Sequence, residues 1–129
     1  MKKIINSYQR IDKRGIFNEY LNGNQSWKSI NGGTMKKGAL MGNHYHKKCL
    51  TFFFIVSGSA EVFSKNLKKK TAKIEKVKLE KLEGVILDKY ETHAWRFLKD
   101  STFLLLKSNK YNENDKDIYE SAVMPGKKL

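Results

Sequence analysis

The sequence predicts a single all-β domain of the sandwich or barrel type. Its 129 residues suffice for one domain with one sizeable core. Short runs rich in aromatic and β-branched residues recur along the chain, and glycines mark the joints between them. Short strands with turn signals roughly every eight to twelve residues are typical of β-sandwiches and β-barrels.

The strands follow from local composition. The clearest is predicted at Leu50 to Val56, which contains three consecutive phenylalanines and precedes a turn at Ser57-Gly58. Further strands are predicted at 59–63, 84–87, 94–97 and 102–107. The segment 73–82 alternates apolar residues with lysine and glutamate, so a strand and a helix both remain open there. The polar segment 109–117 is expected to be a loop or a short helix.

Composition excludes several classes of protein. Hydrophobic residues make up 40% of the chain, which favours a globular fold over disorder. No apolar run approaches the roughly 20 residues that span a bilayer, and the first residues lack a stretch of signal-peptide length. The single cysteine, Cys49, excludes an intrachain disulfide and agrees with a reducing compartment. A cytoplasmic protein with no membrane contact is expected.

Positive charge is the strongest compositional bias. Lysine and arginine number 26 against 13 acidic residues, for a net charge of +13. Such a surface attracts polyanions and phosphates. The lysines are spread along the chain, and only the segment 65–81, interpreted as a hairpin, is dense in them. We therefore interpret the charge as a solvated surface rather than a nucleic-acid site, although it suits a phosphate-bearing small substrate.

The three histidines of the chain are the candidate functional residues. His44 and His46 flank Tyr45, so on a strand both imidazoles lie on one face while Tyr45 points away. Such a pair can chelate a metal ion, place two bases beside one ligand, or be polar groups on a solvated strand face. His93 stands just before the strand predicted at 94–97.

The spacing of glycines and histidines resembles the cupin superfamily. The segment 38–58 begins with a glycine, continues with five residues and the His-x-His pair, and closes on a glycine, like the first cupin motif. His93 lies where the second motif, here 84–97, carries its histidine. The resemblance implies a cupin jelly-roll, or double-stranded β-helix barrel, formed by residues 1–129 as a single domain.

The resemblance also bears on metal binding. It implies that His44, His46 and His93 are the ligands if a divalent ion is bound, with zinc, iron, nickel and manganese as candidates. The glutamate of the first motif is absent, since Leu50 or Thr51 stands in its place. Three histidines can still hold an ion with open positions, and they can equally serve without one.

Three shorter segments resemble a narrower group of cupins. Residues 11–19 are similar to the opening "D-x-R-G-x-F-x-E" of dTDP-4-dehydrorhamnose 3,5-epimerases. Residues 42–48 resemble the "R-G-N-H-x-H-K-K" segment of dTDP-sugar 3,4-ketoisomerases and of the cupin domain of capsular polysaccharide epimerase/reductases. Residues 108–115 resemble the "S-x-x-Y-x-E-x-D" tail of the same group. Met41 replaces an arginine of these motifs, which removes a fork-shaped set of donors.

These families share a substrate and a chemistry. The resemblance implies an isomerase or epimerase of surface-polysaccharide biosynthesis that acts on a nucleotide-linked 4-keto-6-deoxyhexose and requires no cofactor. The reaction needs a base beside the substrate and donors at the developing enolate oxygen. Carried over by motif, His44 and His46 are the candidates for these two roles. A tyrosine is the expected acid, and Tyr90 is the residue chosen for it.

Arg14, Asn43 and Trp95 are the substrate-binding residues that the resemblance implies. Arg14 would bind phosphate, and the alternative is a surface arginine that holds a turn. Trp95 would stack on the nucleotide base or the sugar, and the alternative is core packing. A homodimer is also implied, in which the N-terminal strand exchanges or pairs between two copies.

Other functions remain open at this stage. One is a metal-binding cupin, such as a small oxygenase or lyase, with the three histidines as ligands. Another is a sugar-nucleotide-binding cupin without catalysis, which Met41 allows. Nucleic-acid binding ranks last because it rests on charge alone. The sequence does not choose between dTDP and UDP, or between epimerisation and ketone migration.

Overall fold

The computed structural model describes residues 1–124, and these residues form β-strands and no helix. The predicted all-β class is therefore confirmed, and the ambiguous segment 73–82 contains a strand. Residues 125–129, the end of the predicted domain, lie outside the described residues. In chain order the strands are β1 (Lys2–Ile4), β2 (Tyr8–Asp12), β3 (Gly15–Glu19), β4 (Ser29–Met35), β5 (Leu40–Tyr45), β6 (Thr51–Ser57), β7 (Ala60–Asn66), β8 (Glu75–Leu79), β9 (Gly84–Leu87), β10 (Glu91–Phe97), β11 (Ser101–Lys107) and β12 (Tyr119–Glu120).

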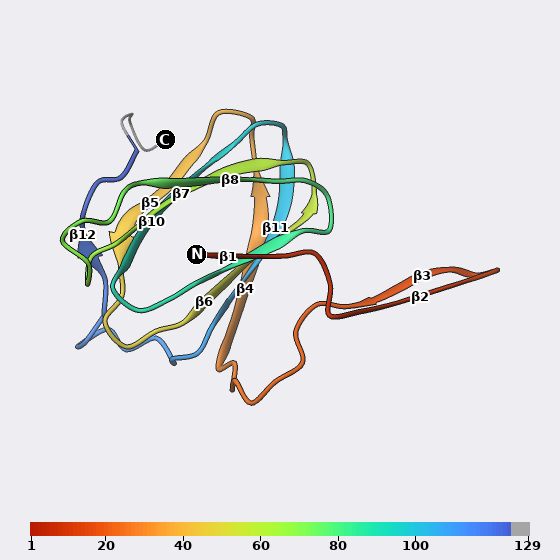
Figure 1. Ribbon diagram of the computed structural model, residues 1–129, viewed down its shortest axis with the longest axis horizontal. Helices are drawn as coiled ribbons and strands as arrows, with labels where there is room; N and C mark the ends of the chain where they lie inside the picture. Colours follow the sequence, from red (N-terminus) through yellow and green to blue (C-terminus); the bar gives the residue numbers. More distant parts are fainter. Residues whose placement is uncertain (125–129) are drawn as a thin grey trace.

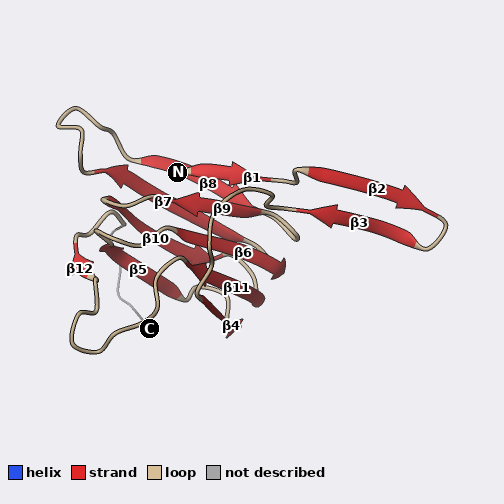
Figure 2. Ribbon diagram, turned by 90° about the horizontal axis from the view of Figure 1, so that it is seen from below, coloured by secondary structure: helices blue, strands red, loops and turns tan. Residues whose placement is uncertain are grey.

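Two five-stranded antiparallel sheets build the barrel. One has the order β1-β9-β6-β11-β4 and the other the order β12-β5-β10-β7-β8. The sheets face each other around a common interior, as Figures 1 and 2 show from two sides. The lysine-rich segment 65–81, predicted as a hairpin, contains the end of β7, a turn and β8, and β8 pairs antiparallel with residues 60–64 of β7. Among residues 1–124 there is no helix long and apolar enough to cross a membrane.

The core lies between the two sheets. Phe53 and Ile55 of β6 face it and have no exposed surface. Phe53 stacks on Trp95 of β10, with ring centroids 4.1 Å apart and an interplanar angle of 15°. Because side chains alternate along a strand, Phe52 and Phe54 face the other way. On that side, Trp27 packs against Phe52 and Tyr20 packs against Phe54.

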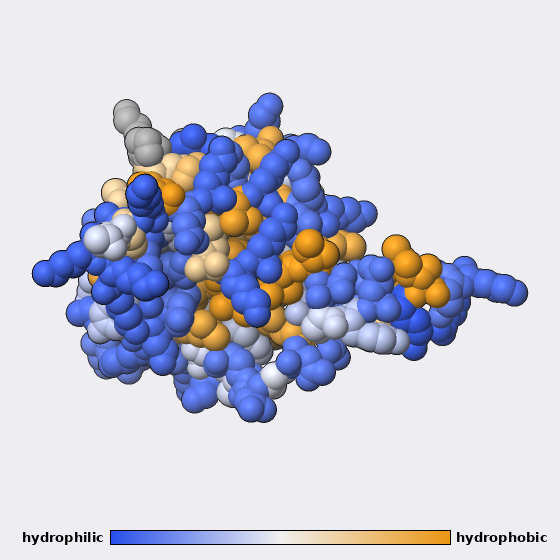
Figure 3. Space-filling view, in the orientation of Figure 1, coloured by the Kyte–Doolittle hydropathy of each residue, from blue (hydrophilic) through white to orange (hydrophobic). Residues whose placement is uncertain are grey.

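The hairpin of β2 and β3 projects from the barrel. It extends away from the two sheets (Figure 1), at the end of the molecule opposite β12. The strands pair antiparallel with one another. Four of their apolar side chains are more than half exposed, namely Tyr8, Ile11, Ile16 and Phe17. Figure 3 shows an apolar group on this projection. The N-terminal strand β1 pairs with β9 of the same chain.

Candidate functional site

A β-bulge in β5 turns the histidines toward the barrel interior. Met41 is opposite Trp95 and Gly42 is opposite Ala94, but the next pair joins His44 to His93, so Asn43 is the extra residue. Gly42 and Asn43 have φ angles of 99° and 61°, the left-handed region that a bulge requires. The bulge shifts the alternation by one residue. Met41 and His44 therefore face the same side of the sheet.

The three imidazole rings converge. Ring centroids are 5.1 Å apart for His44 and His46, 4.9 Å for His44 and His93, and 5.4 Å for His46 and His93. Tyr45 faces the other way and stacks on Tyr119, with centroids 5.3 Å apart. The structure thus brings together the three histidines that the sequence singled out, from two neighbouring strands and the residue that follows β5.

Hydrogen bonds fix the tautomers of the two buried histidines. His46 Nδ1 lies 2.7 Å from the backbone oxygen of Asp117, and His93 Nδ1 lies 3.0 Å from that of Glu91. A carbonyl oxygen only accepts, so each Nδ1 carries the proton and each Nε2 carries the lone pair. His93 Nε2 is buried and has no hydrogen-bond partner within residues 1–124. It is available to a ligand or a metal ion.

Burial keeps these imidazoles neutral. Desolvation lowers the pKa of His46 below its usual value near 6.5. Desolvation, with the charge of His44 as the second cause, lowers the pKa of His93 to about 3. The ammonium group of Lys107 contributes to both shifts. At neutral pH both rings are therefore in the form that accepts a proton or ligates a metal.

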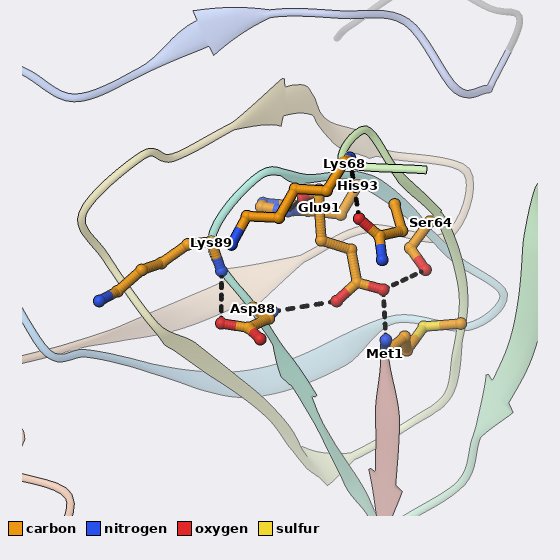
Figure 4. A network of polar contacts seen from close by, with 8 residues as sticks. Met1, Ser64, Lys68, Asp88, Lys89, Glu91 and His93 are labelled. Atoms are coloured by element: carbon orange, nitrogen blue, oxygen red, sulfur yellow. Dashed lines mark hydrogen bonds and ion pairs between the residues drawn. The ribbon is translucent and has the colours of Figure 1, made fainter. Parts of the chain in front are cut away.

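Glu91 fixes the turn that precedes His93. Its carboxylate accepts hydrogen bonds from the Asp88 backbone N–H and the Ser64 hydroxyl, each at 3.0 Å, and contacts the amino group of Met1 (Figure 4). Its backbone carbonyl accepts the bond from His93 Nδ1. One buried residue thus anchors the start of β10 and orients the imidazole two positions later.

A cavity of about 200 Å³ opens beside His46 at one end of the barrel. Much of its wall comes from the loop between β11 and β12, the blue segment at the end opposite the hairpin (Figure 1). Lysine is the commonest residue type in the wall. The lining residues are His46, Lys48, Cys49, Lys107, Asn109, Lys110, Tyr111, Asn112, Asp115, Lys116, Asp117 and Ile118.

Asn43 and Trp95, which were predicted as substrate-binding residues, both make contacts within the fold itself. Asn43 Oδ1 accepts the backbone N–H of Val123 at 2.9 Å and of Met124 at 3.0 Å, and its Nδ2 donates to the Met124 carbonyl. Trp95 is 2% exposed and stacks between Phe53 and His93. Trp95 therefore packs in the core, which was the alternative given for it in the sequence analysis.

Arg14 and Tyr90 lie apart from the cavity. Arg14 is at the tip of the projecting hairpin, where its Nη2 is 2.7 Å from Asp12 Oδ2 and it holds the turn. Tyr90 stacks against Tyr45, on the side of the sheet that faces away from the histidines. The tyrosine that lines the cavity is Tyr111. Tyr111 is the tyrosine of the motif-like segment 108–115. That resemblance assigned it no role, and Tyr90 was predicted as the catalytic acid instead.

The histidines also fit a divalent metal ion. Their ligand atoms lie within 4.8 Å of one another, and they are the only such group of three in residues 1–124. Nitrogen ligands at about 2.0–2.1 Å from a tetrahedral ion are roughly 3.4 Å apart, so small side-chain rotations would close the site. The buried, unpartnered Nε2 of His93 is the kind of atom that such an ion would satisfy.

Comparisons with known families and proteins agree with this architecture. A family model described as the polysaccharide biosynthesis C-terminal domain matches residues 10–119. A search of curated proteins gave no match.

Solved structures of a ketoisomerase, an epimerase and a capsular polysaccharide assembling protein share the fold. A 3,4-ketoisomerase from Helicobacter canadensis superposes with a TM-score of 0.75 at 23% identity, over 94% of this chain and 92% of that one. The rmlC epimerase of Mycobacterium tuberculosis gives 0.73 at 21% identity, over 86% and 64%. The capsular polysaccharide assembling protein CapF of Staphylococcus aureus gives 0.68 at 23%, over 90% of this chain. This chain spans 34% of CapF. These similarities confirm the predicted cupin jelly-roll.

Proposed function

The chain belongs to the polysaccharide biosynthesis C-terminal domain family, and we propose that it is an isomerase or epimerase of a nucleotide-linked 4-keto-6-deoxyhexose in surface-polysaccharide biosynthesis. The observation that carries the proposal is the convergence of three imidazoles, two of them buried and neutral, beside a lysine-lined cavity. The likeness in fold to a 3,4-ketoisomerase and to sugar epimerases supports it.

The chemistry requires a neutral base beside a polarised ketone. A neutral imidazole takes the proton from the carbon next to the carbonyl, and the electron pair of the broken C–H bond moves to the ketone oxygen. The resulting enolate needs a hydrogen-bond donor or a cation at its oxygen. Return of a proton to the other face of the same carbon gives an epimer. Return to the former ketone carbon, with transfer of the neighbouring hydroxyl proton to the former ketone oxygen, moves the ketone.

We assign these roles to the groups that can reach the substrate. His46 borders the cavity and keeps the lone pair of Nε2, so we assign it as the base, and the half-buried His44 as the residue that stabilises the enolate. His93 is 1% exposed and lies behind them. Tyr111 replaces Tyr90 as the proposed acid, because it shares the cavity with His46.

The test is proton NMR of the protein with dTDP-4-keto-6-deoxyglucose in D2O. We expect the sugar H3 or H5 signal to disappear as deuterium enters. Because general acid–base catalysis contributes roughly 10²–10⁴-fold, His44→Ala and His46→Ala should each slow this exchange by at least about 100-fold. Tyr111→Phe should slow it, whereas the matched variant Tyr90→Phe should leave it unchanged. Folded wild-type protein that exchanges neither proton over hours would contradict the proposal for this substrate.

A metal-binding cupin is the second candidate, and the unpartnered Nε2 of His93 favours it. An ion held by His44, His46 and His93 would polarise a substrate oxygen or activate a bound water. Metal analysis of protein purified without chelator should then find a zinc, iron, nickel or manganese ion in stoichiometric amount. His93→Ala should abolish its retention, and wild-type protein that keeps none after incubation with these ions would exclude this candidate.

Binding of a sugar nucleotide without turnover is favoured by Met41. This residue packs against the core opposite Trp95, where it offers no charged donor to a substrate. Tight dTDP or UDP binding, together with the absence of proton exchange, would identify this function in the same NMR samples.

A further inference from the structure

The acidic residues of the cavity wall are already engaged. Asp115 forms an ion pair with Lys48, with Nζ 2.6 Å from Oδ2, and this contact lowers the pKa of Asp115. The Asp117 carboxylate accepts the backbone N–H groups of Lys47 at 2.8 Å and Lys48 at 3.0 Å. The other three lysines of the wall have no carboxylate within ion-pair distance in the described part of the chain. The wall therefore carries unneutralised positive charge.

These three lysines extend from the histidines to the rim. Lys107 is the last residue of β11 and stands two positions after Leu105, which packs against the core. It is half-buried on the inner side of its strand, close enough to His46 for its charge to affect the imidazole. Lys110 and Lys116 are exposed on the loop that follows. The charge thus forms a path from solvent to the imidazoles.

The arginine that the sequence assigned to phosphate lies elsewhere. Arg14 is at the tip of the hairpin. Much of the cavity wall comes from the loop between β11 and β12, and this loop and the hairpin lie at opposite ends of the molecule in both views (Figures 1 and 2). Its guanidinium is already paired with Asp12. Within one chain, Arg14 therefore does not reach a ligand bound at His46, and phosphate recognition at that site falls to other cations.

We propose that Lys107, Lys110 and Lys116 form the diphosphate-binding site for the nucleotide-linked substrate, an inference that rests on the proposed function. A diphosphate carries two or more negative charges, and ammonium groups bind phosphate oxygens as point charges. The side-chain amides of Asn109 and Asn112, in the same wall, add neutral donors. A diphosphate bound by these lysines directs the attached sugar inward, toward His46.

Calorimetric titration with dTDP and with inorganic pyrophosphate tests this site without turnover. We expect the double variant Lys110→Gln/Lys116→Gln, and separately Lys107→Gln, to weaken the Kd of both ligands by about 10-fold or more, since tenfold corresponds to about 1.4 kcal/mol. The matched control is Lys69→Gln/Lys70→Gln. It removes the same charge from the exposed turn between β7 and β8, which is outside the cavity, and should bind like the wild type.

Several results would overturn the assignment. They are wild-type protein that binds neither ligand, cavity variants that bind like the wild type, and a control that loses as much affinity as they do. If Arg14→Gln loses binding while the cavity variants keep it, the diphosphate-binding site is at the hairpin instead. The proposed reaction is judged separately, because protein that binds pyrophosphate at these lysines but exchanges no sugar proton contradicts the reaction and not the binding site.

Discussion

At the scale of single residues, burial converts ordinary histidines into a reactive site. His46 and His93 each donate Nδ1–H to a backbone carbonyl and present the Nε2 lone pair in a poorly hydrated interior. Their lowered pKa keeps them unprotonated in the pH range where a surface histidine would begin to charge. As a consequence, the fold should lose stability at acidic pH.

The stability of the fold should fall as the pH falls below about 6.5. Burial lowers the folded-state pKa of His46 and His93 below the unfolded value of 6.5, so in this range the unfolded chain binds more protons. The contribution of His93 is complete above pH 6.5 and decreases toward pH 3, by at most about 1.4 kcal/mol per pH unit. The contribution of His46 falls in the same direction. Calorimetric melting between pH 7 and 4 measures this slope, and His93→Gln should flatten it. An equal slope in His93→Gln would contradict the assignment to His93.

At the scale of elements, one bulge sets the direction of the histidines. Without the bulge, strict alternation would place Met41 and His44, which are three positions apart, on opposite faces of β5. The bulge needs Gly42, because a Cβ there would lie 2.6 Å from the His93 backbone oxygen and 2.9 Å from the Ala94 Cα. Strand geometry and the chemistry of the site thus depend on the same glycine.

We therefore expect Gly42→Ala to destabilise the fold by about 1–3 kcal/mol, as strain at a positive φ and a close backbone contact both act there. It should also displace His44 and lower metal or substrate binding. Urea denaturation, followed by tryptophan fluorescence, gives the free energy of unfolding. The control is Gly33→Ala in β4, where a Cβ meets nothing within 4 Å. Equal stability of the two variants would refute this account of the bulge.

At the scale of the whole molecule, the projecting hairpin exposes a group of apolar side chains. The exposed apolar side chains of β2 and β3 are costly to leave in water, and such a patch marks a contact site. A second copy of the chain is the partner that we propose, in line with the homodimer implied by the sequence. Such a dimer would also carry Arg14 onto another protomer.

Light scattering coupled to size exclusion should therefore show a dimer of the wild-type chain. The double variant Ile11→Lys/Phe17→Lys should be a monomer with unchanged β-sheet circular dichroism, because burying two charges in the contact removes its apolar gain. The control Lys69→Gln/Lys70→Gln, in the exposed turn between β7 and β8, should remain a dimer. A wild-type monomer at the concentrations used for NMR would contradict this assembly.

Local sequence signals were enough to predict the fold class, the strands β6, β7, β9, β10 and β11, and the group of three histidines. Period-two alternation, glycine turns and motif spacing are local signals, and β-strands and turns respond to them directly. The ambiguity at 73–82 was resolved only by pairing of β8 with β7, since propensity alone allowed a helix.

Which side chains are available to bind a ligand depends on tertiary contacts. Asn43 is engaged by the segment 121–124, Trp95 by the core and Arg14 by its own turn. Lys107, Lys110 and Tyr111 join His46 because the chain after β11 returns to pair β12 with β5. Such contacts join residues more than fifty positions apart. No local pattern specifies them, because they depend on how the two sheets close.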